Sequence, residues 1–340
     1  MAPAYPPLSA RGRWDPTRYT FDQMVKTVVL AGGTGQVGTI LRRAFEADGC
    51  NVVVLSRGGA DGTVRWDAST LGDWAERLEG ADVVVNLAGR SVNCRYGREN
   101  RRAIMDSRVE STRVLGEAIA RAARPPRVWL QSSTATIYAH RLDAPNDERT
   151  GILGGDEPDA PDTWRFSIDV AKSWERAAHE AITPHTRKVL LRSAIVLSPD
   201  RGGIFDTLLG LVRRGVGGPA AGGRQIVSWI HHHDFVRSVR WLIERDDVAG
   251  PVNLASPNPL PQREFFAALR EAWGTRIGLP ATRWMLELAA IAMRTETELI
   301  LKSRYVVPGR LLEQGFAFEE PDWPAAARQL VADWRAGAAR

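Results

Sequence analysis

Several glycines stand close together in the segment GGTGQVG, which follows a short apolar run and precedes an amphipathic stretch. A loop that binds a dinucleotide needs a tight turn, close backbone approach to the pyrophosphate and tight packing of the next helix, and glycine permits all three. The pattern alone is weak, but it stands between a predicted strand and a predicted helix, the context that such a loop requires. The amides at the start of that helix would face the phosphates. The predicted cofactor-binding residues of this loop are Gly32, Gly33, Thr34, Gly35, Gln36, Val37 and Gly38.

The next apolar run ends in Ser56 and Arg57, where an NAD-binding site usually has an acidic residue for the ribose hydroxyls. An acid would repel a 2′-phosphate, whereas Ser56 and Arg57 can bind one. We therefore predict NADP(H) rather than NAD, with a surface arginine in a loop as the alternative for Arg57. Asp67, after the run TVRW, is placed to meet the adenine, or else it caps a helix.

Three histidines and an aspartate are adjacent at 231–234, and these residue types are common metal ligands. Three adjacent histidines on one regular element cannot all face one ion, since pairs that bind zinc on a helix are spaced four residues apart. No cysteine or acidic cluster completes a ligand set, so we predict no metal.

Arg192, near the end of another apolar run, has the chemistry to bind an acidic group of a substrate, or it is a buried structural arginine.

These residues lie in or near short runs that are apolar on successive positions, as in strands covered on both faces. Longer amphipathic stretches alternate with the runs. This alternation predicts an α/β fold with a Rossmann-type, doubly wound parallel sheet, whose ligands bind at the carboxyl ends of the strands. The runs are TVVLAGG (27–33), NVVVLSR (51–57), DVVVNLAG (82–89), RVWLQSS (127–133) and KVLLRSAIVL (188–197).

Glycine and proline crowd residues 198–223, after which the pattern becomes mostly helical. We interpret 25–198 as an NADP-binding Rossmann domain and allow for a strand of its sheet that returns from 225–257. Residues 199–340 are interpreted as a smaller, mostly helical substrate-binding lobe, and residues 1–24 as an N-terminal arm.

The composition is that of a soluble globular protein, with 44% hydrophobic and 25% charged residues. Two cysteines make no disulfide framework, and no run has the length of a membrane span or a secretory signal, so we expect a cytoplasmic protein. The net charge is +5, but the basic residues are spread along the chain. Their densest run, RYGRENRR at 95–102, is interpreted as a solvated helix start or an anion site rather than a nucleic-acid patch. We expect a small-molecule substrate, no nucleic-acid or membrane partner, and a monomer or homodimer.

Three segments, GGTGQVG, NLAG (86–89) and LQSSTATIYA, together resemble the short-chain dehydrogenase/reductase superfamily. The second half, including LRSAIVLSPDRGGIF, SWIHHHDFVRSVRWLIE and VVPGRLLEQGFAFEEPD, resembles its atypical epimerase-family, or sugar-nucleotide-epimerase-like, oxidoreductases. The resemblance spans about residues 25–333. It implies a Rossmann domain, NADP(H) and a small substrate lobe, but no particular substrate. It also adds Leu87, Ala88 and Gly89 to the expected cofactor-binding residues.

Reductases of this superfamily use a tyrosine as acid/base, a lysine four residues later and a serine or threonine that orients the substrate oxygen. This sequence contains no Tyr-x-x-x-Lys, because Ile168 stands four residues before Lys172. The stretch from Phe166 to Glu175 instead is similar to the pattern F-x-x-x-L-x-x-x-W-E of the atypical family. The missing tyrosine therefore looks like a trait of that family.

The resemblance implies a set of residues around the nicotinamide and the substrate. Ser133 and Thr134 would lie by the nicotinamide, Tyr138 would be a substitute acid or pack locally, and Lys172 would contact a ribose or substrate or be solvated. Asp169, on the same helix, would act only if desolvated. The expected substrate-pocket residues, with core packing as the alternative, are Trp229, His231 and His233.

We expect an NADP-dependent oxidoreductase or epimerase-like enzyme that acts on a small organic substrate. The retained serine, the Lys172 helix and the second lobe favour this hypothesis. Two alternatives gain from the missing tyrosine: an NADP-binding regulator or scaffold whose catalytic set has decayed, and a non-redox dehydratase or cyclase on the same fold.

Overall fold

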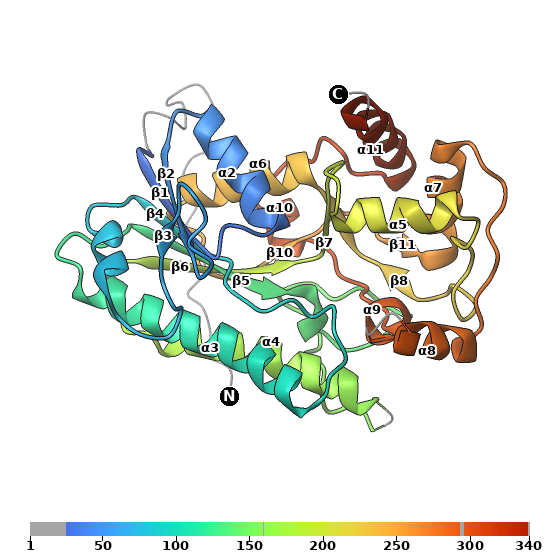
Figure 1. The fold of residues 1–340 in the computed structure, drawn as a ribbon, viewed down its shortest axis with the longest axis horizontal. Coiled ribbons are helices and arrows are strands. Elements are labelled where there is room, and N and C mark those ends of the chain that lie inside the picture. The colour runs from blue at the N-terminus through green and yellow to red at the C-terminus, as the bar shows by residue number, and fades with distance from the viewer. Residues whose placement is uncertain (1–24, 159, 293–295, 339–340) are drawn as a thin grey trace.

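Seven parallel strands form the central sheet of the computed structural model, which describes residues 25–158, 160–292 and 296–338. The predicted N-terminal arm, 1–24, lies outside the described residues. The strand order β10-β6-β5-β4-β1-β2-β3 is that of a doubly wound sheet, which confirms the predicted α/β class (Figure 1). The strands are β1 (Thr27–Ala31), β2 (Asn51–Ser56), β3 (Val64–Arg65), β4 (Val83–Asn86), β5 (Val128–Thr134), β6 (Arg187–Ser193) and β10 (Gly250–Leu254).

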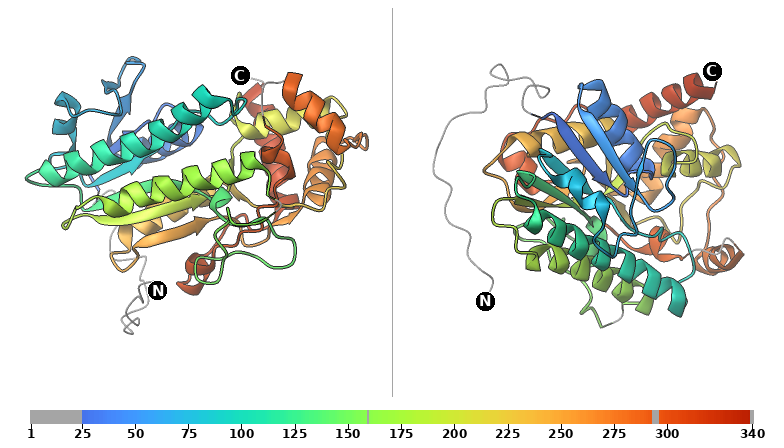
Figure 2. Two further views of the ribbon diagram at one scale, coloured as in Figure 1. Left: turned by 90° about the horizontal axis from the view of Figure 1, so that it is seen from below. Right: turned by 60° about the vertical axis from the view of Figure 1, so that its left-hand side comes forward.

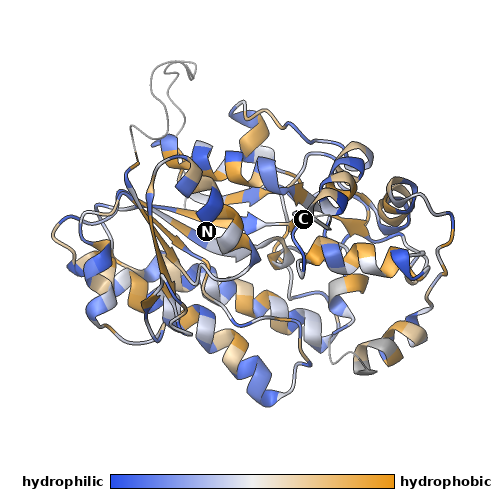
Figure 3. Ribbon diagram, turned by 45° about the horizontal axis from the view of Figure 1, so that its top comes forward, coloured by the Kyte–Doolittle hydropathy of each residue, from blue (hydrophilic) through white to orange (hydrophobic). Residues whose placement is uncertain are grey.

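The strands with continuous apolar runs occupy the middle of the sheet, where both faces are covered. In β1, the residues from Val28 to Ala31 are all fully buried, and Val29 lies in register between Val53 and Val84 of the neighbouring strands. Figure 3 shows this part of the sheet largely in the hydrophobic colour. The missing alternation in the sequence therefore has the expected cause.

Helices cover both faces of the sheet (Figures 1 and 2). One layer holds α2 (Gln36–Ala47), α6 (His232–Glu244) and α10 (Gly309–Glu313), whose side chains share one apolar core with the sheet. The opposite layer holds the 3-10 helix η1 (Asp73–Leu78) and the long helices α3 (Arg98–Arg121) and α4 (Asp162–Glu180). A short 3-10 helix, η2 (Ala135–Ile137), follows β5 directly.

The second lobe lies beyond the carboxyl ends of the strands, on the right in Figure 1. Its core packs Phe205, Phe265 and Trp323 around Trp229, and the rings of Phe265 and Trp323 are stacked with centroids 4.1 Å apart. Its strands are β7 (Ile195–Leu197), β8 (Ile226–Val227), β9 (Trp229–His231) and β11 (Leu260–Pro261). Its helices are α5 (Ile204–Arg213), α7 (Gln262–Trp273), α8 (Arg283–Ala292), α9 (Glu298–Leu301) and α11 (Trp323–Ala338).

The chain does not divide into two units at a single residue. Strand β10, inside the range from which the sequence allowed a returning strand, pairs with β6 at the edge of the sheet. Helices α6 and α10 also pack on the sheet, although the sequence assigned them to the second lobe. Among the described residues, no helix is both long and apolar enough to cross a membrane.

Candidate functional site

The glycine loop joins β1 to α2 at the carboxyl edge of the sheet. Gly32 has a φ of +75°, and a Cβ there would lie 2.7 Å from the Cα of Ala88. A Cβ on Gly38 would lie 2.3 Å from the carbonyl oxygen of Gly33. These positions therefore accept glycine alone, while Gly35 faces open space and precedes the first turn of α2.

The start of α2 is suited to bind an anion. Its N-cap residue, Gly35, makes no side-chain cap, and the first turn contains no acidic residue. The unpaired amides and the helix dipole at such an end attract a phosphate. This arrangement fits a pyrophosphate, as the sequence predicted.

The other predicted residues of the loop differ in what they contact. The Gln36 amide donates to the Val196 carbonyl and the Ser198 hydroxyl and accepts from the amide of Ile204. It therefore links the loop to the second lobe, while Val37 packs against the apolar core and Thr34 is exposed.

A cavity of about 530 Å³ opens beyond the ends of β2 and β3. Arg57 lines it with Asp67, and so does Arg65, which the sequence analysis missed although it stands in the segment TVRWD. Two guanidinium groups at this place suit the 2′-phosphate of an adenosine. Ser56 is buried, and its hydroxyl accepts a hydrogen bond from the amide of Gly58.

Asp67 does not cap a helix, since the next one, η1, begins at Asp73 with Gly72 as its N-cap, and its carboxylate instead closes a local turn. Its carboxylate accepts hydrogen bonds from the amides of Ser69 and Thr70, each at 2.8 Å, and from the Thr70 hydroxyl. These bonds, from Thr70 above all, lower the pKa of Asp67 to about 2. The residue also lines the cavity, so it holds the cavity wall in shape.

The segment from Asn86 to Gly89 follows β4 and lies against the glycine loop. The Asn86 amide oxygen accepts a bond from the Ala88 amide, and its nitrogen donates to Gln131 of β5. Leu87 packs against the apolar core. Next to Gly89 lies the guanidinium of Arg108, 3.0 Å from the place that a Cβ would take.

Ser133 belongs to a closed, buried polar cluster beneath α4, which we call the Glu175 cluster: Ser133, Tyr138, Glu175, Arg192 and Asn253. Ser133 donates to Glu175 at 2.5 Å, and Arg192 holds both carboxylate oxygens of Glu175 at 2.8 Å. The Tyr138 hydroxyl accepts from Arg192 and donates to Asn253, each at 2.9 Å. Burial would lower the pKa of Arg192, but the bonds with Glu175 hold it above its ordinary value.

This cluster corrects two expectations. Tyr138 was expected to reach the reacting groups as a substitute acid, but its hydroxyl is buried and bonded on both sides, and burial raises its pKa. Arg192 was expected to bind a substrate acid, but Glu175 already neutralises it. Both therefore take the structural roles that were the alternatives, and Ser133 supports the same ion pair.

Thr134, the next residue of β5, faces a different space, because successive side chains of a strand point to opposite sides. It lines a cavity of about 130 Å³, which we call the Thr134 cavity. Four segments that lie far apart in the sequence form its walls. The lining residues are Val92, Tyr96, Ile104, Arg108, Thr134, Thr136, Phe166, Ser167, Val170, Trp174, Glu298 and Arg304.

Helix α4 presents different residues to this cavity than the Tyr-x-x-x-Lys spacing suggested. Ser167 lines the cavity, whereas Ile168 is buried against Gly154 and Gly155. The Lys172 amine lies on that same side, 3.3 Å from where a Cβ of Gly155 would be, and does not line the cavity. Its side chain therefore does not reach the Thr134 cavity, and a contact of Lys172 with a ribose or a substrate stays a prediction. Asp169 is exposed.

Hydroxyl groups and a buried carboxyl gather in the Thr134 cavity. The Ser167 hydroxyl donates to Glu298 and also hydrogen-bonds to the Tyr96 hydroxyl. Burial raises the pKa of Glu298 and raises that of Tyr96 to about 12. Both groups are therefore held toward their protonated forms. No local pattern in the sequence indicates this set, because its members come from around residues 96, 167 and 298.

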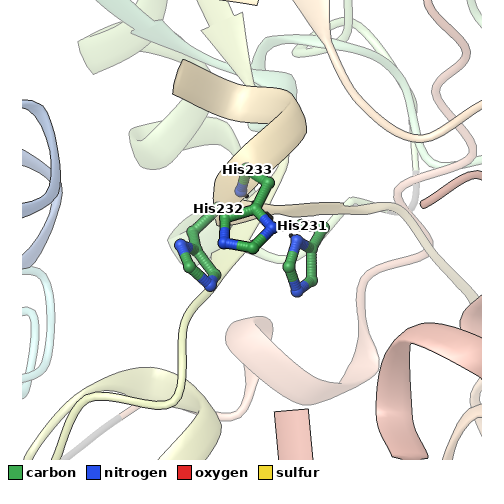
Figure 4. A group of neighbouring side chains, drawn as sticks. All are labelled: His231, His232 and His233. Carbon is green, nitrogen blue, oxygen red and sulfur yellow. Dashed lines mark hydrogen bonds between the residues drawn. The ribbon is translucent and has the colours of Figure 1, made fainter. Parts of the chain in front are cut away.

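The three adjacent histidines lie where β9 ends and α6 begins (Figure 4). Their nitrogen atoms lie within 4.8 Å of one another, so the argument that adjacent histidines cannot face one ion is wrong. It assumed one regular element, whereas His231 ends a strand and His232 starts a helix. That no metal binds stays a prediction.

None of these histidines lines the Thr134 cavity. His231 is buried and accepts a bond from the amide of His233, while His232 and the exposed His233 line another cavity between α2 and α6. Burial lowers the pKa of His231 to about 3 and that of His232 to about 4. Trp229 is fully buried in the second-lobe core. The expectation that Trp229, His231 and His233 line the substrate pocket therefore does not hold for this cavity.

Comparison with known proteins places the chain among nucleotide-binding relatives. The NAD dependent epimerase/dehydratase family matches residues 28–161, and a domain of unknown function, DUF1731, matches residues 281–330. The human epimerase family protein SDR39U1 is 31% identical over 308 residues, which cover 90% of this chain and 99% of the human protein. The epimerase family protein SERP0438 of Staphylococcus epidermidis is 29% identical over 314 residues, covering 90% of this chain and 99% of the relative.

The fold has a solved counterpart. The crystal structure of human SDR39U1 (isoform 2) with NADPH has a TM-score of 0.78 and 29% sequence identity, and covers 90% of this chain and 99% of that chain. A UDP-N-acetylglucosamine 4-epimerase from Bacillus cereus, 17% identical with a TM-score of 0.70, covers 91% of this chain and 99% of that chain. The latter shows only the shared fold.

Proposed function

The chain belongs to the epimerase family that includes human SDR39U1, a family of NAD(P)-binding proteins, and on this premise we propose that it is an NADP(H)-dependent oxidoreductase or epimerase-like enzyme for a small organic substrate. The observation that carries this proposal is the Thr134 cavity. It gathers Tyr96, Ser167 and Glu298 beside the strand end at which ligands of this fold bind.

The chain has the groups that an NADP(H) molecule needs. The glycine loop and the start of α2 would hold the pyrophosphate, and Arg57 with Arg65 would hold the 2′-phosphate. The structure of human SDR39U1 with NADPH supports NADP(H) over NAD. When bound, the cofactor supplies or accepts a hydride.

The residues of the Thr134 cavity would handle the proton that accompanies this transfer. Tyr96 would give its hydroxyl proton to a substrate oxygen, and Ser167, whose hydroxyl donates to Glu298, would orient the Tyr96 hydroxyl. This chain of groups would do the work of the missing tyrosine.

The preference for NADP(H) is tested by titrating the protein with NADPH and with NADH. We expect tighter binding of NADPH, and we expect the double change Arg57→Ala and Arg65→Ala to erase the difference while NADH affinity stays the same. Arg77→Ala, an exposed arginine of η1, serves as the control. Equal affinity of the parent protein for both cofactors would contradict the preference for NADP(H).

The catalytic part is tested by following NADPH oxidation across a panel of small aldehydes, ketones and oxo acids. We expect turnover of at least one of them, reduced about a hundredfold or more in Tyr96→Phe. Tyr305→Phe, which alters a tyrosine outside the cavity lining, is the matched control. Tight NADPH binding without turnover on any compound would favour the regulator hypothesis instead.

A further inference from the structure

We propose that the Thr134 cavity binds the carboxylate of a small organic acid through the guanidinium of Arg108, an inference that rests on the proposed function and names its substrate class. Arg108 belongs to α3 and lines the cavity opposite Thr134 and Ser167. Nothing local in the sequence distinguishes Arg108 from the other arginines of this helix.

The guanidinium of Arg108 is fixed in place but not saturated. It lies over the ring of Trp174, 5.0 Å from the centroid, which holds its plane. Its Nη1 donates to the carbonyl oxygens of Arg90, at 3.0 Å, and Ile104, at 3.1 Å. Both bonds leave from this one nitrogen. The other edge of the guanidinium is therefore left for a ligand.

No carboxylate in the described part of the chain forms an ion pair with Arg108. The other arginine of the cavity, Arg304, differs, since its guanidinium lies 3.5 Å from Glu298 and also donates to the Thr136 hydroxyl. Burial lowers the pKa of Arg108 to about 10, so it stays charged at neutral pH. A half-buried cation that pairs with no carboxylate of the described residues is costly to desolvate, and an anionic ligand offsets that cost.

The size and lining of the cavity narrow the class of anion. One uncompensated guanidinium matches one carboxylate, which an arginine can bind through two parallel hydrogen bonds. A volume of about 130 Å³ is roughly that of four water molecules, which suits an acid of only a few carbons. The apolar walls, among them Ile104, Phe166 and Val170, suit a short hydrocarbon chain.

Arg108 also lies beside Gly89, in the segment expected to touch the cofactor, so a phosphate of the cofactor is another source of negative charge. The two sources are separable by experiment. If Arg108 served the cofactor, its loss would weaken NADPH binding. If it binds the substrate, its loss leaves NADPH affinity unchanged and removes only the preference for an acid.

The test uses isobutyrate and isobutyramide, which have the same shape and differ in charge. Each is titrated into the full-length protein, with and without saturating NADP⁺, and binding is followed by calorimetry and ligand-observed NMR. We expect isobutyrate to bind at least tenfold more tightly than isobutyramide. In Arg108→Met we expect this ratio to fall to about one while NADPH affinity stays unchanged. In Arg108→Lys we expect an intermediate ratio, because an ammonium keeps the charge but not the two-pronged geometry.

Arg102→Met is the matched control, since Arg102 lies on the same helix but is exposed and pairs with Asp106. It should keep the parent's tenfold ratio. The proposal is overturned if the parent binds both compounds alike, if Arg108→Met keeps the preference for isobutyrate, or if it loses NADPH affinity. Failure of the parent to bind NADPH would instead contradict the proposed function. The two failures are distinguishable, because the ratio of the affinities for isobutyrate and isobutyramide is also measured without NADP⁺.

Discussion

Two neighbouring residues of β5, Ser133 and Thr134, lead into polar regions of opposite character. Ser133 enters the Glu175 cluster, in which the charge of Arg192 is neutralised and each polar group has a partner. Thr134 enters a cavity in which Arg108 keeps an uncompensated charge and a chain of hydroxyls ends at Glu298. A closed network stabilises a fold, whereas an incomplete one is completed by a ligand. On the proposed function, this difference predicts that the substrate contacts the Thr134 side of the strand.

The largest effect on stability should come from breaking the ion pair between Glu175 and Arg192 in the Glu175 cluster. Glu175→Gln leaves the buried Arg192 without a counter-charge, so we expect the free energy of unfolding to fall by about 3–5 kcal/mol. Urea denaturation followed by circular dichroism measures it. Glu180→Gln, at an exposed position of the same helix, should change it by less than about 0.5 kcal/mol. Equal effects of the two changes would mean that the ion pair of Glu175 with Arg192 does not stabilise the fold.

The next largest effect is a pH dependence of the free energy of unfolding, which we expect from Lys302. This lysine donates to the carbonyl oxygen of Thr136, a residue that lines the Thr134 cavity. Burial, with Arg304 nearby, lowers the pKa of Lys302 from 10.5 to about 7. Between these values the unfolded chain holds a proton that the folded protein has released, so folding becomes more favourable as pH rises. We expect the free energy of unfolding to rise by about 1 kcal/mol per pH unit between pH 8 and 10 from this group.

The variant Lys302→Met removes this contribution. The free energy of unfolding is measured by urea denaturation at pH 7, 8, 9 and 10 for both proteins. From pH 7 to pH 10, the value for the parent should rise steadily relative to the value for the variant. A difference that does not change with pH would show that Lys302 keeps its ordinary pKa.

A smaller contrast separates the two neighbours on β5. Ser133→Ala removes a hydrogen bond to the buried Glu175 carboxylate, and we expect a loss of about 1.5–3 kcal/mol in the free energy of unfolding. Thr134→Val keeps the shape and removes only a hydroxyl at the cavity wall, so its cost should stay below about 1 kcal/mol. Turnover should respond in the opposite order. If Ser133→Ala were as stable as the parent, the proposed difference between a structural Ser133 and a cavity-lining Thr134 would be contradicted.

The smallest effect expected on stability is that of Arg108→Met. Since it removes a half-buried charge that has no counter-ion among the described residues, we expect the free energy of unfolding to stay the same or to rise by up to about 1 kcal/mol. Arg192→Met should have the opposite sign, because it leaves the Glu175 carboxylate unpaired. Thermal denaturation of both variants side by side checks the sign. A large loss of stability in Arg108→Met would mean that the arginine is structural.

The sequence by itself determined the parts of this protein that depend on neighbours along the chain. The apolar runs around Val29 and Val84 specify strands buried on both faces, and the glycines at 32 and 38 are required by contacts within or beside their own loop. Arg57 follows β2 directly and so reaches the cavity that its position predicted. Local spacing sufficed, because each of these features is fixed by a strand end and the turn after it.

Only the tertiary structure decided which side chains share a space. Counting four residues back from Lys172 indicated Ile168, but the rotation of α4 in its packing presents Ser167 to the cavity. The three histidines were judged as one regular element, while the chain changes from strand to helix between them. Tyr96, Arg108 and Glu298 meet only because the long connections between them fold back on the sheet. Burial and charge compensation arise from such distant contacts, so no pattern along the chain distinguishes Arg108, which has no counter-ion among the described residues, from Arg192, which has one.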